Sequence, residues 1–167
     1  APADRALLRW ASVLGASFSG DLIEHVLESD PDAALDSESW DRLAEFVERD
    51  PYVAGTFHFR HALIRDAAYA GLSFRRRREL HARVGEVMRG TVGDDDPETL
   101  SLHFSLAERP GEAWIYSLVA AENAKGKFAN ADAAEFYRRA LDAAAELPAL
   151  ARADVGHAWE SLGDVLE

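Results

Sequence analysis

The chain has 167 residues, of which 48% are hydrophobic and 29% are charged, a composition typical of folded rather than disordered proteins. Its net charge of −12 repels phosphate backbones, so general nucleic-acid binding is disfavoured. There is no cysteine, which excludes disulfides and thiolate metal sites, and no apolar run of about 18 residues that would predict a membrane span. We therefore expect a cytoplasmic protein with no nucleic-acid or membrane partner.

The first part of the chain shows three helical patterns followed by a strand pattern. Apolar residues at helical spacing predict helices over residues 4–14 and 19–27. Trp40, Leu43, Ala44 and Val47 predict a third helix that starts at Ser37 or Ser39 and ends at Asp50-Pro51. Residues 52–53 and 57–59, separated by a turn at 54–55, predict a small β-hairpin. Three short helices and a hairpin are the order of a winged helix.

Residues 59–69 combine a histidine and charged residues with an apolar helical pattern. Leu63, Ile64, Ala67 and Ala68 predict a buried helical face, and they place His61 in the first turn, where anions bind at helix N-termini. His61 can therefore contact a phosphate, or it can be an ordinary capping or core histidine. The same alternatives apply to Arg65, which can form a salt bridge within its own helix or support a nucleotide phosphate.

The string from His61 to Ala68 resembles the MHD-type motif of signal-transduction ATPases with numerous domains (the STAND class). The longer string from residue 57 to 69, continued by residues 75–81, resembles bacterial adenylate cyclases and LuxR-type regulators that carry an ATPase and tetratricopeptide repeats. The resemblance implies a winged-helix domain that follows an ATPase core, with the histidine reading the β-phosphate of ADP. Ala62 replaces the acidic residue common in plant members, so a carboxylate role at that position does not transfer.

Residues 75–78 are four consecutive arginines at the start of a helix whose apolar stripe includes Leu80 and Val84. Because cations near a helix N-terminus oppose the helix dipole, an acidic partner is expected nearby. Arg75, Arg76, Arg77 and Arg78 are either a solvated helix face or a docking surface for an acidic patch on the ATPase core or the repeats.

Residues 90–97 combine glycines, acidic residues and a proline, which predicts a linker between a first domain of residues 1–89 and a helical second domain of residues 98–167. Trp159, Leu162, Gly163 and Leu166 follow the spacing of the first tetratricopeptide helix. Ala133, Tyr137 and Ala140 follow that of the second, and the small residues Ala121 and Gly163 indicate a 42-residue period. We expect a mostly α protein whose candidate partner-binding residues on the repeats are Phe128, Asn130 and Tyr137.

The sequence contains no phosphate-binding loop and no recognisable catalytic or metal-ligand motif. We therefore expect a non-catalytic fragment of a longer protein. The longer protein is a candidate ATPase-regulated nucleotide cyclase. The fragment would bind no cofactor alone, whereas the full-length protein would use ADP and ATP. Its expected partners are an upstream ATPase domain and a protein or small-molecule ligand on the repeats. One alternative is a helical scaffold without a nucleotide role. The other, a DNA-binding winged helix, is disfavoured by the net charge of −3 over residues 38–50.

Overall fold

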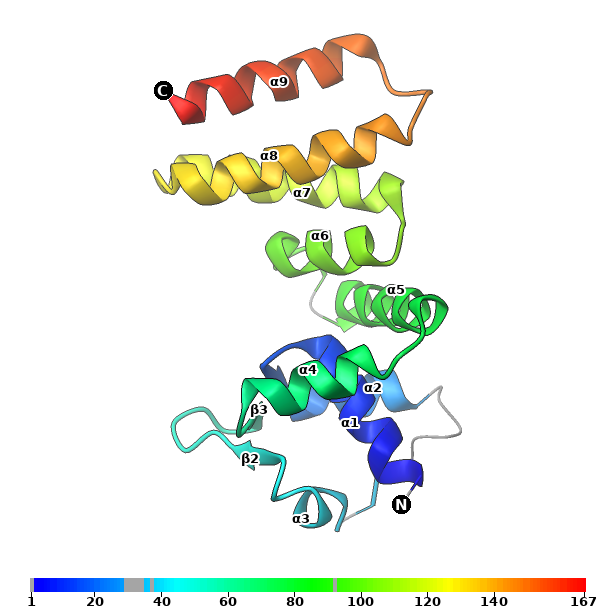
Figure 1. Cartoon of the computed structure of the whole chain (residues 1–167). Coiled ribbons are helices and arrows are strands. Elements are labelled where there is room, and N and C mark those ends of the chain that lie inside the picture. Colours follow the sequence, from blue (N-terminus) through cyan, green and yellow to red (C-terminus); the bar gives the residue numbers. More distant parts are fainter. Residues whose placement is uncertain (1, 29–34, 37, 92) are drawn as a thin grey trace. The chain divides into compact units, whose positions relative to one another are not determined.

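The computed structural model describes residues 2–28, 35–36, 38–91 and 93–167 (Figure 1). These residues are mostly helical and include a small three-stranded antiparallel sheet, which agrees with the expected mostly α class. The chain divides into two compact units, Ala1–Val87 and Met88–Glu167. The division falls inside a long helix, and that helix continues to Thr91, into the first residues of the expected linker. Ser37, one of the two expected helix starts, and Val92 of the expected linker lie outside the described residues.

The first unit alternates helices with short strands. Its elements are α1 (Pro2–Leu14), β1 (Ser17–Ser19), α2 (Gly20–Leu27), α3 (Ser39–Arg42), β2 (Val47–Arg49), β3 (Thr56–Phe59), α4 (Ala62–Ala70) and the first part of α5 (Phe74–Thr91). The first two helices were predicted at nearly these bounds. Ser19 caps α2 by accepting a hydrogen bond from the Leu22 backbone N–H group at 3.3 Å.

The sheet has β3 at its centre, paired antiparallel with β1 on one side and β2 on the other. Phe57 lies opposite Phe18 in β1, and the two rings are stacked with centroids 5.9 Å apart. The Trp40 ring of α3 also stacks on Phe57, with ring centroids 4.2 Å apart. The buried face of the sheet is therefore held by an aromatic cluster, which is the kind of cross-strand packing that stabilises short strands.

The structure corrects the third helix and the hairpin predicted from the sequence. Helix α3 stops at Arg42, and Val47 begins a strand that pairs with β3. Residues 52–53, the expected first strand, lie exposed in the loop between β2 and β3. The reason is that Val47 fits both patterns: it is four residues beyond buried Leu43, and it also lies opposite Phe59 with its side chain buried. Strand pairing thus overrides the helical spacing.

The buried face predicted for α4 is also wrong in part. Leu63 is 80% exposed and Ala67 is exposed, and no residue of α4 reaches the buried class, whereas Ile64 and Ala68 are half-buried. Helix α4 packs against α1, and one side of the helix is enough for that contact. Leu63, two positions after His61, is consequently a surface residue.

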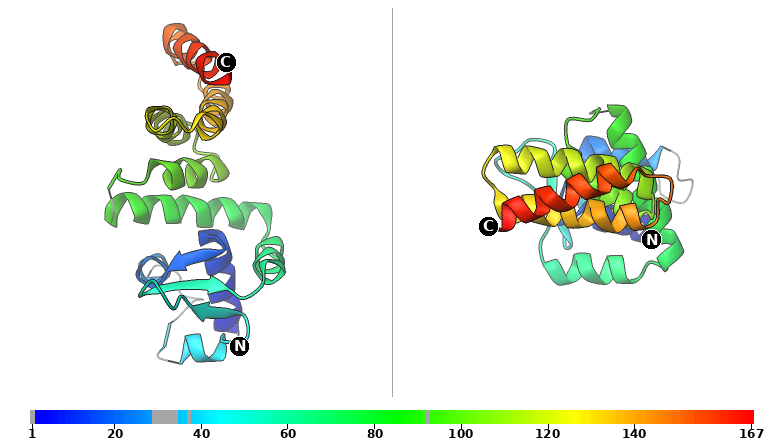
Figure 2. Two further views of the ribbon diagram at one scale, coloured as in Figure 1. Left: turned by 90° about the vertical axis from the view of Figure 1, so that its left-hand side faces the viewer. Right: turned by 90° about the horizontal axis from the view of Figure 1, so that it is seen from above.

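The second unit is a series of antiparallel helices, of which α7 and α8 lie side by side (Figures 1 and 2). Its elements are the end of α5, α6 (Pro97–Leu106), α7 (Pro110–Gly126), α8 (Asn130–Ala145) and α9 (Arg152–Leu166). Asp96 caps α6 by accepting a hydrogen bond from the Thr99 backbone N–H group at 3.1 Å. The first residues of α7 and α9 are 42 positions apart, whereas those of α6 and α8 are 33 positions apart.

We predict that Gly20→Ala destabilises the first unit by about 1–3 kcal/mol. A Cβ atom on Gly20 would lie 2.9 Å from the Phe57 ring and 3.1 Å from the Gly55 carbonyl oxygen, to which the Gly20 N–H group donates at 2.7 Å. Urea unfolding followed by tryptophan fluorescence measures the change. Gly156→Ala in α9, where an added Cβ meets nothing within 4 Å, is the control and should stabilise by roughly 0.5–1 kcal/mol. Equal stability of Gly20→Ala and the wild type would contradict the close approach.

Candidate functional site

His61 is the residue immediately before α4, two positions after the central strand β3. Its backbone is extended, with φ −140° and ψ 132°, and its carbonyl oxygen accepts a hydrogen bond from the Ile64 N–H group at 3.0 Å. The side chain is exposed and makes no capping hydrogen bond to the first turn in the described structure. The imidazole is therefore positioned beside the positive end of the helix dipole and accessible to an anion.

Arg65, one turn further along α4, is held by contacts inside its own unit. Its Nε atom donates to the Ser12 carbonyl oxygen of α1 at 3.1 Å, and Nη1 is 3.2 Å from the Asp66 carboxylate. The guanidinium also lies over the Tyr69 ring, 5.3 Å from its centroid. These contacts connect α4 to α1, so the structure places Arg65 where it supports the position of His61's helix.

The four arginines of residues 75–78 do not point to one common surface. Arg77 turns inward, where it donates to the Ala70 carbonyl oxygen at 3.2 Å and lies 4.7 Å from the Tyr69 ring centroid. Arg75, with a 90% exposed side chain, pairs with Glu79 at 2.8 Å, and Arg76 shares the same carboxylate at 3.5 Å. Arg78 lies over the exposed ring of Phe74. The acidic partner expected for this run is thus present on its own helix in Glu79.

The structure does not bring Phe128, Asn130 and Tyr137 together on one surface. Phe128 is 91% exposed in the turn between α7 and α8, with a positive φ of 58°, and Asn130 begins α8 as an exposed residue. Tyr137 is only 1% exposed, and its hydroxyl donates to Glu122 of α7 at 2.5 Å. Tyr137 is therefore part of the interior, although its hydroxyl end reaches a pocket.

That pocket is a groove of about 460 Å³ in the second unit. Helix α7 contributes one wall and α9 the other, with Tyr137 of α8 between them; the lining residues are Trp114, Leu118, Glu122, Tyr137, Ala153, Asp154, His157, Ala158 and Ser161. Sequence reasoning identified only Tyr137 among them. The sequence shows only that residues 114–119 are apolar on more than one side of a helix; which of these sides faces α9 is a property of the folded structure.

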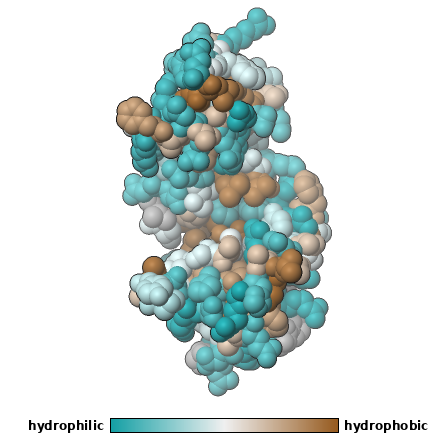
Figure 3. Space-filling view, turned by 60° about the vertical axis from the view of Figure 1, so that its left-hand side comes forward, coloured by the Kyte–Doolittle hydropathy of each residue, from teal (hydrophilic) through white to brown (hydrophobic). Residues whose placement is uncertain are grey.

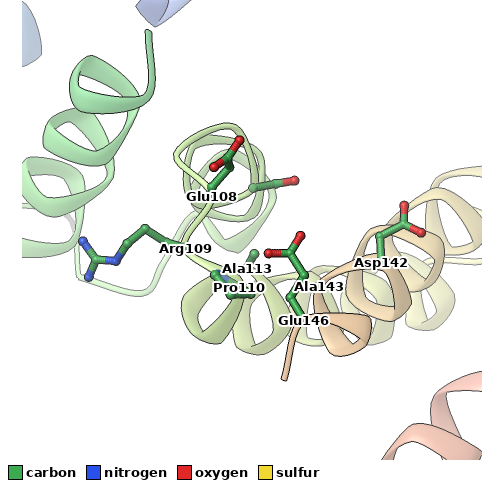
Figure 4. Close-up of a pocket in the computed structure, with 8 residues that line it drawn as sticks. Glu108, Arg109, Pro110, Ala113, Asp142, Ala143 and Glu146 are labelled. Atoms are coloured by element: carbon green, nitrogen blue, oxygen red, sulfur yellow. The ribbon is translucent and has the colours of Figure 1, made fainter. Parts of the chain in front are cut away.

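A second, smaller pocket of about 80 Å³ lies at the turn between α6 and α7 and the end of α8. Figure 4 shows its acidic residues Glu108, Asp142 and Glu146, with the Arg109 side chain extending away from Asp142. Arg109 forms an ion pair with Glu112 in the first turn of α7. Within the described residues, no group of three or more His, Asp or Glu side chains could hold a metal ion.

No protein-family model matches the chain, and neither the curated proteins nor the solved structures that were searched gave a match. None of the helices in the described ranges is long and apolar enough to cross a membrane. The residues and their geometry therefore carry the functional proposal.

We predict that Arg65→Met destabilises the first unit by about 1–2 kcal/mol, because it leaves the Ser12 carbonyl oxygen without its charged donor. Arg75→Met is the matched control: its ion pair is exposed and lies within one helix, so the expected loss is roughly 0.5 kcal/mol or less. Urea unfolding of both variants measures the difference. Equal losses would show that Arg65 does not connect α4 to α1.

Proposed function

We propose that this chain is a non-catalytic regulatory part of a STAND-type ATPase, in which a winged-helix domain is followed by tetratricopeptide-type helices. The observation that carries the proposal is the position of His61: an exposed imidazole at the start of α4, in a string that resembles the family's phosphate-reading motif. Leu63, exposed two residues later, supplies an apolar surface beside it that an ATPase core would cover.

Two features of the architecture support this proposal. In the first unit, the order α1-β1-α2-α3-β2-β3 with β3 central resembles that of winged-helix domains. In the second unit, antiparallel helices with a 42-residue offset between α7 and α9 resemble the longer repeats of regulator-type arrays.

In the proposed mechanism, ADP bound to an upstream ATPase core places its β-phosphate against His61. The hydrogen bond from the imidazole anchors the winged-helix domain to the core and keeps the protein in its inactive state. Exchange of ADP for ATP, together with a partner on the helical repeats, releases that contact. A coupling free energy of about 1–3 kcal/mol is enough for a five- to 150-fold change in activity, and one charge-assisted hydrogen bond supplies that order of energy.

A helical scaffold without a nucleotide role is the second candidate, and the groove between α7 and α9 favours it. DNA binding has less support. The helix expected to read bases is reduced to the four residues of α3. Its arginine, Arg42, pairs with Asp36 and Asp4 at 3.0 Å each. A side chain so engaged does not reach a phosphate or a base edge without breaking two ion pairs.

We predict that His61→Ala changes the nucleotide that the longer protein retains. The test uses the chain together with the ATPase core that the proposal places upstream, purified as wild type and as variant, with the released ADP and ATP quantified. The wild type should retain ADP, and the variant should lose it or shift toward ATP. His25→Ala is the control, because His25 is also exposed and its ring contacts the Asp21 carbonyl oxygen of its own helix at 2.7 Å.

The two candidate functions give different results in this measurement. If wild type and His61→Ala retain the same nucleotide and exchange it at the same rate, the nucleotide switch is refuted and the scaffold function remains. If His25→Ala changes the nucleotide as much as His61→Ala does, the effect is not specific to the start of α4.

A further inference from the structure

We infer that the groove between α7 and α9 binds a positively charged, extended peptide segment that carries at least one apolar side chain. This inference rests on the proposed role of the repeats as a sensing surface, and it specifies the chemistry of their partner. Three properties of the groove support it: its size and apolar lining, its two carboxylates, and the charge of the unit around it.

The groove has the size and lining of a binding site for one or two side chains. Its volume of about 460 Å³ lies in the range of roughly 300–1,000 Å³ that is usual for ligand sites. Leu118 on α7 is half-buried, Trp114 is 7% exposed, and the lining residues Ala153 and Ala158 on α9 have small side chains. The stem of a lysine or arginine, or a neighbouring apolar side chain, would pack against Leu118 and the exposed part of the Trp114 ring.

The Glu122 carboxylate belongs to an exposed residue of α7 and is oriented by a hydrogen bond from α8. It accepts a hydrogen bond of 2.5 Å from the Tyr137 hydroxyl, which itself belongs to a side chain that is 1% exposed. Burial and the neighbouring Glu122 carboxylate raise the pKa of Tyr137 to about 12, so the hydroxyl keeps its proton and remains the donor. Glu122 therefore stays an acceptor with lone pairs left for a second, cationic donor.

Asp154 provides a second carboxylate on the opposite wall. None of the nine residues that line the groove is lysine or arginine, so the described structure offers no internal cation in the lining. Lys125, one turn beyond Glu122 on α7, pairs instead with Asp164 of α9 at 3.3 Å. A cationic side chain beside Glu122 would therefore supply the positive charge that the lining lacks, and a second cationic side chain further along an extended peptide would face Asp154.

The net charge of the second unit favours a basic ligand over an acidic one. Residues 88–167 contain 15 acidic residues and seven lysines and arginines, a net charge of −8 out of −12 for the chain. This field attracts a basic peptide and repels an acidic peptide, a nucleic acid and a second copy of this acidic chain. Figure 3 shows exposed apolar side chains as separate brown patches on a largely hydrophilic surface, so a partner needs both an apolar and a charged complement.

The test titrates the full 167-residue chain with two capped synthetic peptides, Gly-Lys-Leu-Lys-Gly and Gly-Glu-Leu-Glu-Gly. Binding is measured by calorimetry and by the shift of the Trp114 indole N–H resonance. We expect the lysine peptide to bind, to weaken with added salt, and to shift Trp114 rather than the exposed Trp159 of α9. The glutamate peptide should not bind.

The double variant Glu122→Gln, Asp154→Asn should weaken the lysine peptide about tenfold. The glutamine still accepts the Tyr137 hydrogen bond, so the fold is retained. The control, Asp142→Asn with Glu146→Gln, removes the same number of charges from the same unit but lines the other pocket, and it should change affinity by less than about twofold. Should the double variant unfold, Asp154→Asn alone replaces it, because Asp154 is exposed in the first turn of α9.

Three results would overturn the inference. The first is that the lysine peptide does not bind. The second is that the double variant and its control lose the same affinity for that peptide. The third is a Trp114 shift that depends on protein concentration rather than on peptide, which would assign the groove to a second copy of the chain. None of these results involves a nucleotide. If the peptide does not bind, the outcome of the His61 measurement is unaffected. If the nucleotide switch is refuted, the groove can still bind a basic peptide as part of a helical scaffold.

Discussion

The close approach of α7, α8 and α9 is the constraint on which the groove depends. Buried alanines lie at the contacts between these helices: Ala120, Ala121 and Ala124 on α7, Ala133 and Ala140 on α8, and Ala158 on α9, none more than 3% exposed. Side chains of this size allow helix axes to come closer than leucine or isoleucine would. A larger residue at any of these positions would separate the helices and change the width of the space between α7 and α9.

Tyr137 connects this alanine-rich helix packing to a polar group of the groove. Its ring fills the space that the small residues leave, and its hydroxyl ends at Glu122, where the interior of the unit meets the groove. A phenylalanine there would fill the same volume but would leave Glu122 free to rotate into water. The same side chain thus belongs to the core and orients the carboxylate that faces a ligand, which is why its burial is compatible with a role beside a binding surface.

The sequence predicted what depends on local periodicity and missed what depends on distant pairing. The helical spacing around Trp10, Ile23 and Tyr137 identified α1, α2 and α8, because long amphipathic patterns have one interpretation. Val47 satisfied a helix and a strand equally, and only its pairing with Phe59 decides between them. The groove could not be predicted, since its walls lie about 40 residues apart in the chain and the exposure of each wall is a tertiary property. The sequence singled out His61 only by resemblance, and the exposure of its side chain could not be predicted.

The two proposed sites would recognise ligands of opposite charge, and this has a consequence for regulation. Around His61, the nearby arginines Arg65 and Arg60 are engaged by Ser12, Asp66, Ala44 and Glu48. In the proposed switch, the imidazole and the helix N-terminus would therefore be the groups that contact the phosphate. The groove is lined by the carboxylates of Glu122 and Asp154, by apolar side chains, and by the polar residues Tyr137, His157 and Ser161. The carboxylates of the groove would repel a nucleotide phosphate, so the two proposed ligands would not compete for the groove. Two ligands that do not compete for one site can affect each other only through a change in the protein itself, and linkage then requires the effect to be reciprocal. Peptide in the groove that favours release of ADP from a His61-anchored core would bind more tightly once ADP has left.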